Sequence, residues 1–142
     1  MYSQFLIEHS VEISCIIEHW DPCGLLNRLS LGEYRIADSY SRQSSNHGGT
    51  AIIVRKGIDY LKLSQIEELS VENHIEMVTL KIPHENLNIL CIYRPPSAVF
   101  REASRYTNTS ETCIDNIFLN IDCSSYLSRT FDPHLSDHCV QE

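Results

Sequence analysis

The chain has 142 residues, 42% of them hydrophobic and 21% charged, a composition that predicts a globular protein with one core and a single domain over residues 1–142. Its formal net charge of −8 argues against sequence-independent DNA binding through the surface as a whole, because contacts to phosphate need Lys and Arg. It contains no run of about eighteen apolar residues and no signal-peptide pattern, so we expect an intracellular protein, nuclear or cytoplasmic, that does not bind membranes.

The first half of the chain predicts one helix and three strands, because apolar positions recur at helical spacing near the start and alternate with polar ones afterwards. The predicted elements are a helix at 2–9 and strands at 11–17, 34–40 and 50–55. Gly48-Gly49, just before the last of these strands, predicts a close approach of the backbone to another group.

The second half predicts further strands joined by turns. They are a short strand or irregular segment at 58–69, a strand at 74–82, a turn at 83–86, and strands at 87–93, 113–119 and from 139 onward. The strands at 74–82 and 87–93 are close enough in sequence to form an antiparallel hairpin.

Glu18 follows the first strand and is the first candidate for chemistry. A carboxylate at the end of a buried strand is well placed for a hard cation such as Mg²⁺, which prefers one or two carboxylate oxygens and keeps several waters. The alternative for such a residue on its own is a solvated side chain at a strand end. His47, in the polar loop before Gly48, is similarly either a ligand or a surface histidine.

The end of the chain holds a second group of candidates. Asp115 lies inside an apolar strand, and Ser136-Asp137-His138 precedes the last one. A buried carboxylate needs a partner, and Asp115 or Asp137 could accept a hydrogen bond from a ring nitrogen of His138. That bond would fix the histidine tautomer and favour the protonated form, which suits contact with a phosphate or proton transfer. A hydrogen bond in a turn or cap is the structural alternative.

The six cysteines include no C-x-x-C pair, and Cys15 and Cys91 lie in apolar runs. Reduced thiols packed as small hydrophobic side chains are therefore expected rather than a disulfide framework. A zinc site is the alternative for the residues near the end of the chain, but its candidate ligands match no usual zinc spacing: Cys123, His134, His138 and Cys139.

Five motifs occur in an order that resembles one known family. They are IIEHW at 16–20, HGGTAI at 47–52, IYRPP at 92–96, IDNIF at 114–118 and LSDHC at 135–139. Together they resemble the endonuclease/exonuclease/phosphatase superfamily, which has the DNase I-like fold, and they are most similar to the reverse transcriptase-associated endonuclease domain of non-LTR retrotransposons.

The resemblance implies an α/β (α+β) fold, an αββα sandwich of two mainly antiparallel sheets flanked by helices. It implies a Mg²⁺- or Mn²⁺-dependent phosphodiesterase that nicks DNA and needs no small-molecule cofactor. A phosphatase acting on sugar or inositol phosphates shares this fold, but the YRPP and IDNIF motifs favour the retrotransposon branch. Basic residues near one face would then contact DNA, the candidates being Arg42, Arg55, Lys56, Arg94, Arg101 and Arg105.

The resemblance also implies a role for each matching residue. His138 would contact the scissile phosphate or transfer a proton, and Asp115 would orient it. Glu18 and Asp137 would hold the metal, Asp137 also completing the nucleophile geometry. Tyr93 would donate its hydroxyl to the scissile phosphate, although a packing role at the strand end is its alternative. The substrate-binding candidates are Arg94, Asn116 and Ser136, and Glu76 is a secondary candidate near the site.

The chain departs from the family after the YRPP motif. No G-D-x-N occurs in the sequence, which indicates an internal deletion near 97–101, and the family strand that carries a metal-site Asn would precede Met1. Losing one transition-state hydrogen-bond donor typically lowers a rate by about 10²–10³. A missing inner strand would also leave two open edges that must pair with each other or with another chain. An impaired enzyme is expected, or an inactive remnant that at most binds a partner or nucleic acid.

Overall fold

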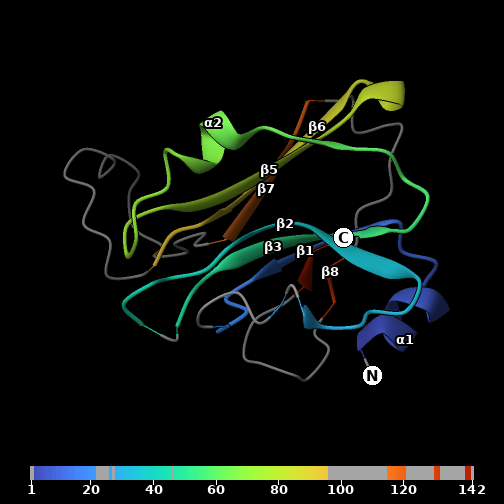
Figure 1. Cartoon of the computed structure of the whole chain (residues 1–142), viewed down its shortest axis with the longest axis horizontal. Helices are drawn as coiled ribbons and strands as arrows, with labels where there is room; N and C mark the ends of the chain where they lie inside the picture. Colours follow the sequence, from blue (N-terminus) through green and yellow to red (C-terminus); the bar gives the residue numbers. More distant parts are fainter. Residues whose placement is uncertain are drawn as a thin grey trace, which may run out of the picture.

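The computed structural model describes residues 2–21, 26, 28–45, 47–95, 115–120, 130–131 and 140–141. It has mixed α+β structure with two stacked sheets, in which every described strand pairing is antiparallel (Figure 1). The fold class predicted from the sequence is therefore confirmed. The elements are α1 (Tyr2–Glu8), β1 (Ile13–Ile17), β2 (Tyr34–Tyr40), β3 (Thr50–Arg55), β4 (Leu61–Lys62), α2 (Ser64–Glu67), β5 (Glu76–Ile82), the 3-10 turn η2 (Pro83–Glu85), β6 (Leu87–Tyr93), β7 (Asp115–Leu119), β8 (Thr130–Phe131) and β9 (Val140–Gln141).

The first sheet has the strand order β2-β3-β1-β9-β8. The interior strand β3, between β2 and β1, is rich in β-branched residues, which suit a pleated surface covered on both sides. Thr50 lies opposite both Ile17 and Tyr40, and Arg55 lies opposite Tyr34 at the other end of the sheet. The ends of β1 and β2 therefore lie together, beside the start of β3.

The second sheet has the order β4-β5-β6-β7. Its β5–β6 hairpin turns through η2 and Asn86, whose φ of 51° lies in the left-handed region that Asn tolerates. Buried and half-buried residues alternate along β6, as expected for a strand with one face on the core. The predicted hairpin is thus confirmed.

The main core lies between the two sheets. In it, Ile52 and Val54 of the first sheet pack against Val78, Leu80 and Cys91 of the second. All five side chains are completely buried. The outer face of the first sheet is covered by α1, whose Leu6 packs with Tyr34 and Ile53, while α2 lies beside β5 on the opposite side of the molecule (Figure 1). Because apolar side chains fill the space between the sheets, polar side chains from the two sheets can meet at the ends of the sandwich.

Most of the predicted elements have the expected bounds. The strands at 34–40, 50–55 and 87–93 coincide with β2, β3 and β6. The segment 58–69 differs, because it contains the one-turn helix α2 besides the short strand β4. Cys15 and Cys91 are both buried, as predicted, and the other four cysteines lie outside the described residues. In the described part of the chain, no helix has the length and apolar character needed to span a membrane.

The strands on either side of the predicted deletion pair directly with each other. β6 ends in the YRPP motif and β7 contains the IDNIF motif, and five residue pairs join them from Ile89↔Leu119 to Tyr93↔Asp115. Open edges left by a missing inner strand would each carry unpaired backbone groups, and pairing between the two edges satisfies them. The backbone groups of β6 and β7 therefore satisfy each other, whereas the deletion itself stays a prediction.

Candidate functional site

Residues from both sheets meet at the end of the sandwich where β1 and β6 finish. The hydroxyl of Tyr93, the last residue of β6, donates a hydrogen bond to Oε1 of Glu18, which follows β1. The two residues are 75 positions apart in the chain. Two of the candidates chosen from separate motifs are therefore in direct contact.

Strand register brings two further acidic positions to this end of the second sheet. Tyr93 lies directly opposite Glu76 on β5 and opposite Asp115 on β7. Residues paired across neighbouring strands have Cβ atoms only about 4.5–5.5 Å apart. Glu76, Tyr93 and Asp115 thus form one row across three strands, and Asn116 is one position further along, opposite Ile92.

Glu76 is completely buried and shares its carboxylate between two donors. Its Oε1 accepts from Arg42 Nε at 2.5 Å, and its Oε2 accepts from the backbone N–H of Gly49 at 2.7 Å. Arg42 is itself only 7% exposed, and its guanidinium carbon lies 5.7 Å from the centre of the Tyr93 ring. This ion pair neutralises both charges inside the sandwich and packs against the tyrosine that reaches Glu18.

The two glycines of the HGGTAI motif explain how these groups fit together. Both have positive φ angles, +79° at Gly48 and +89° at Gly49. A Cβ atom at Gly48 would lie 2.4 Å from Arg42 Cζ, and one at Gly49 would lie 2.4 Å from the His19 ring. Only glycine satisfies both the backbone conformation and the available space. The close approach predicted from the sequence is confirmed.

The same glycines hold the backbone around Glu18. Gly49 O accepts from Glu18 N at 2.7 Å, and Gly48 O accepts from Trp20 N at 3.1 Å. Glu18 has a φ of 57° and Trp20 a φ of 54°, a left-handed conformation that costs a non-glycine residue roughly 1–2 kcal/mol. Such strain persists only where surrounding contacts impose it, and it is often found at functional sites.

His19 is a half-buried histidine with an assignable neutral tautomer. Its Nδ1 accepts from the backbone N–H of Asp21 at 3.0 Å, so Nε2 carries the proton and donates to Tyr40 O at 2.9 Å. Burial lowers its pKa, against the opposing effects of the Tyr40 carbonyl and the Asp21 carboxylate. Sequence reasoning did not single out His19, and the only clue was its place next to Glu18.

His47 is a surface residue rather than a ligand of any described group. It is exposed, and its ring packs edge-on against Trp20 with 5.0 Å between the ring centres. This agrees with the surface alternative considered from the sequence. Its contact with Trp20 belongs to the loop that carries the two glycines.

The described residues fit a hydrated divalent cation through one carboxylate. Glu18 is half-buried at a strand end, whereas both oxygens of Glu76 are occupied. Within the described residues, no group of three or more His, Cys, Asp or Glu side chains could enclose a metal ion. Mg²⁺ commonly binds through one or two carboxylates, with waters and substrate phosphates completing its shell. The donor chemistry of Glu18 is compatible with that mode.

Several predicted site residues lie outside the part of the chain that can be described. Ser136, Asp137 and His138 are not among the described residues. Asp115 and Asn116 are described by their backbone alone. Arg94 follows Tyr93 and is half-buried at the same end of the molecule. Glu18, Tyr93 and Asp115 are thus the primary candidates that the described structure brings together.

The expected gathering of basic residues on one face is wrong for two of them. Arg42 and Arg94 lie at the end of the sandwich where Glu18 lies. Arg55 is the last residue of β3 and Lys56 the next one, so both lie at the opposite end. Arg101 and Arg105 lie outside the described residues. The reason is the length of β3, which carries the chain across the whole sheet between Gly49 and Arg55.

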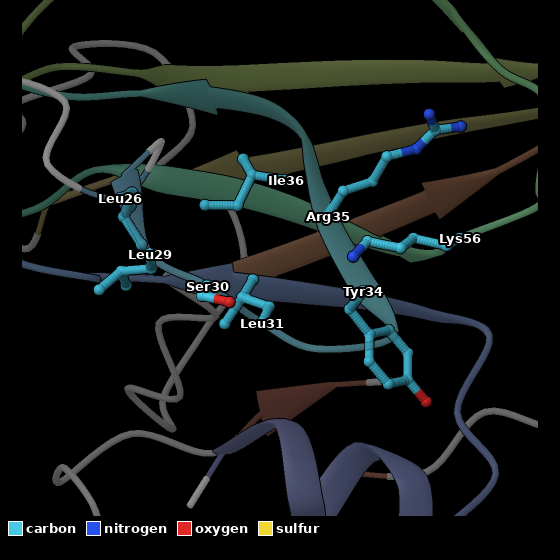
Figure 2. A pocket seen from close by; sticks show the side chains of 8 residues that line it. All are labelled: Leu26, Leu29, Ser30, Leu31, Tyr34, Arg35, Ile36 and Lys56. Atoms are coloured by element: carbon cyan, nitrogen blue, oxygen red, sulfur yellow. The ribbon is translucent and has the colours of Figure 1, made fainter.

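A pocket of about 260 Å³ lies at that opposite end (Figure 2). Its walls are Leu26, Leu29, Ser30, Leu31, Tyr34, Arg35, Ile36 and Lys56. Both basic side chains donate to backbone carbonyls, Arg35 to Ile58 O at 2.8 Å and Lys56 to Gly32 O at 2.5 Å. None of the residues that line the pocket belongs to the site described above.

The carboxylate of Glu76 pairs with Arg42, and that of Glu18 accepts from the Tyr93 hydroxyl. No protein-family model, curated protein or solved structure matches the chain. The chemistry of this end of the sandwich and the sequence motifs are therefore the basis for a functional proposal.

Proposed function

We propose that the chain is a shortened DNase I-like phosphodiesterase, derived from the endonuclease domain of a non-LTR retrotransposon, that nicks DNA with the help of Mg²⁺ or Mn²⁺. The observation that carries the proposal is the contact between Tyr93 and Glu18. It joins the YRPP motif to the strand-end glutamate across two sheets, and the resemblance to the endonuclease/exonuclease/phosphatase superfamily implies that both residues belong to one site. The position of Asp115 opposite Tyr93 adds support from the IDNIF motif.

In this proposal the residues divide the work of phosphodiester hydrolysis. Glu18 and Asp137 hold the cation, which when bound supplies positive charge to the phosphate oxygens. Tyr93 donates a hydrogen bond to the negative charge that develops on the phosphate, and Asp115 orients His138 for proton transfer. The substrate is positioned by Arg94, Asn116 and Ser136.

Activity is expected to be weak. The sequence lacks the G-D-x-N motif, whose Asp orients the nucleophile and whose Asn binds the phosphate in the family that the chain resembles. Loss of one such donor lowers a rate by about 10²–10³, and loss of the group that positions the nucleophile lowers it further. Detection therefore requires an assay that registers a single nick in a long DNA, such as relaxation of a supercoiled plasmid.

The test is a plasmid-nicking assay with Mg²⁺ that compares the wild type with Glu18→Ala and His138→Ala. Both variants should lose the nicking activity of the wild type. A suitable control is Glu33→Ala, because Glu33 is 58% exposed and pairs with Arg55 at the opposite end of the first sheet. This control should nick as the wild type does. Equal background in all four proteins would contradict the enzyme proposal.

The second candidate is a catalytically inactive remnant that binds a partner or nucleic acid. The absence of G-D-x-N from the sequence favours it, because two family functions depend on that motif. It predicts that DNA binding, measured by fluorescence anisotropy of a labelled duplex, is unaffected by Glu18→Ala. In the enzyme proposal the same change weakens Mg²⁺-dependent DNA binding, since the cation contacts the phosphate.

A second copy of the chain is the proposed partner for an open sheet edge. Among the described strands, β7 ends the second sheet and exposes Phe118 to 52% and Leu119 to 42%. The other three described edge strands are short or irregular: β4 and β8 have two residues each, and β2 carries exposed Arg35 and a register shift between Ile36 and Asp38. Unprotected edges are the ones that pair with another chain.

A further inference from the structure

Tyr93 and a divalent cation require the same carboxylate. The Tyr93 hydroxyl donates to Oε1 of Glu18, and a hydrogen bond from a neutral donor to a carboxylate is stronger than one between neutral groups. A cation that coordinates Oε1 withdraws electron density from this oxygen and so weakens the hydrogen bond that it accepts. The two interactions oppose each other wherever they use one oxygen.

The ring of Tyr93 is held in place independently of this hydrogen bond. Tyr93 is 2% exposed, its backbone pairs with strands on both sides, and the Arg42 guanidinium lies over its ring. Arg42 is in turn fixed by the buried carboxylate of Glu76. The hydroxyl proton can nevertheless rotate about the C–O bond to another acceptor while the ring stays where it is.

We propose that the Tyr93 hydroxyl competes with the divalent cation for Glu18. The tyrosine stabilises the metal-free carboxylate, and cation binding releases the hydroxyl to donate to a phosphate oxygen instead. The Tyr93 hydroxyl can therefore donate to the substrate only after the cation is bound. This inference rests on the proposed function, because it takes Glu18 as the residue that holds the cation.

The test is the affinity for Mn²⁺, measured from the electron paramagnetic resonance signal of the free ion. Tyr93→Phe removes the competing hydroxyl and should bind Mn²⁺ about tenfold more tightly, as expected when a hydrogen bond to a charged group is lost from the metal-free state. Glu18→Gln should lose this binding with either residue at position 93. Tyr34→Phe is the matched control, because it loses a buried hydrogen bond to Val11 O at the opposite end of the sheet. Its affinity should equal that of the wild type.

A second measurement on the unmodified chain covers the case in which Tyr93→Phe does not fold. With tyrosine labelled with ¹³C at Cζ, Mg²⁺ should shift the Tyr93 resonance of the wild type but not that of Glu18→Gln. Unchanged or weaker Mn²⁺ binding by Tyr93→Phe, or an unshifted resonance at saturating Mg²⁺, would overturn the competition and leave the metal site standing. Equal Mn²⁺ binding by wild type and Glu18→Gln would overturn the metal site and the competition with it.

Discussion

Single residues at this site are constrained by neighbours that lie far away in the sequence. Gly49 illustrates the point, because its N–H bonds to Glu76, its carbonyl accepts from Glu18, and its Cα faces the His19 ring. A side chain there would disturb three contacts at once. Glycine is therefore required by the geometry of the site as well as by a positive φ.

Gly49→Ala should destabilise the protein by about 2–4 kcal/mol, because it combines a left-handed backbone with a steric clash. Gly57→Ala is the control, since its φ of +101° is also positive but no atom lies within 4 Å of the added Cβ. It should cost only about 1–2 kcal/mol, the conformational part alone. Urea unfolding of both variants gives the comparison. Equal losses would show that the His19 ring yields to the added methyl group.

His19 predicts how stability depends on pH. Burial lowers its pKa below the ordinary value of 6.5, so the folded state holds the neutral ring more strongly than the unfolded state does. The resulting stability is fully present above 6.5 and is lost as the pH falls through the lowered pKa of the folded state. The free energy of unfolding, measured against pH, should therefore decrease on the acid side of 6.5.

His19→Gln tests the origin of this dependence. The Gln side chain can accept from Asp21 N and donate to Tyr40 O without titrating. Its unfolding free energy should change less steeply with pH in the same range. An unchanged slope would mean that another group is responsible for the acid sensitivity.

At the scale of elements, the buried pair between Arg42 and Glu76 links the loop after β2 to the first residue of β5. Arg42→Met should cost about 3–5 kcal/mol, because it leaves the Glu76 carboxylate buried without its cation. The double variant Arg42→Met, Glu76→Gln should recover most of this loss, since no charge is then left unpaired. The unfolding free energies of the two single variants and the double variant form the required cycle. A double variant as unstable as Arg42→Met would show that packing, rather than charge, is what the pair provides.

At the scale of the whole molecule, the proposed association between copies would use β7, the edge strand of the second sheet among the described residues. Phe118→Lys places a charge on that edge, which disfavours pairing with another strand. The variant should stay monomeric at concentrations where the wild type associates in analytical ultracentrifugation. Its stability should change by no more than about 0.5 kcal/mol, because Phe118 is 52% exposed. A wild type that is monomeric at high concentration would contradict the proposed partner.

The sequence by itself determined most of the strands and the sandwich they form. The short runs 34–40, 50–55 and 87–93, which lie between turn or loop residues, predicted β2, β3 and β6. It did not determine the helix at Ser64–Glu67, where a single turn is too short to produce a periodic pattern. The resemblance carried by the motifs assigned Glu18, Tyr93 and Asp115 to one site, but it did not specify the contact between Tyr93 and Glu18.

Only the tertiary structure decided which side chains meet. The contact between Tyr93 and Glu18 spans 75 positions, and the pair between Arg42 and Glu76 spans 34. Both depend on how the two sheets stack, which local patterns do not specify. The neutral tautomer of His19 depends in the same way on the carbonyl of Tyr40, which the neighbouring strand supplies. Local periodicity fixes the faces of each strand, whereas the partners of buried polar groups follow from the packing of strands that are distant in sequence.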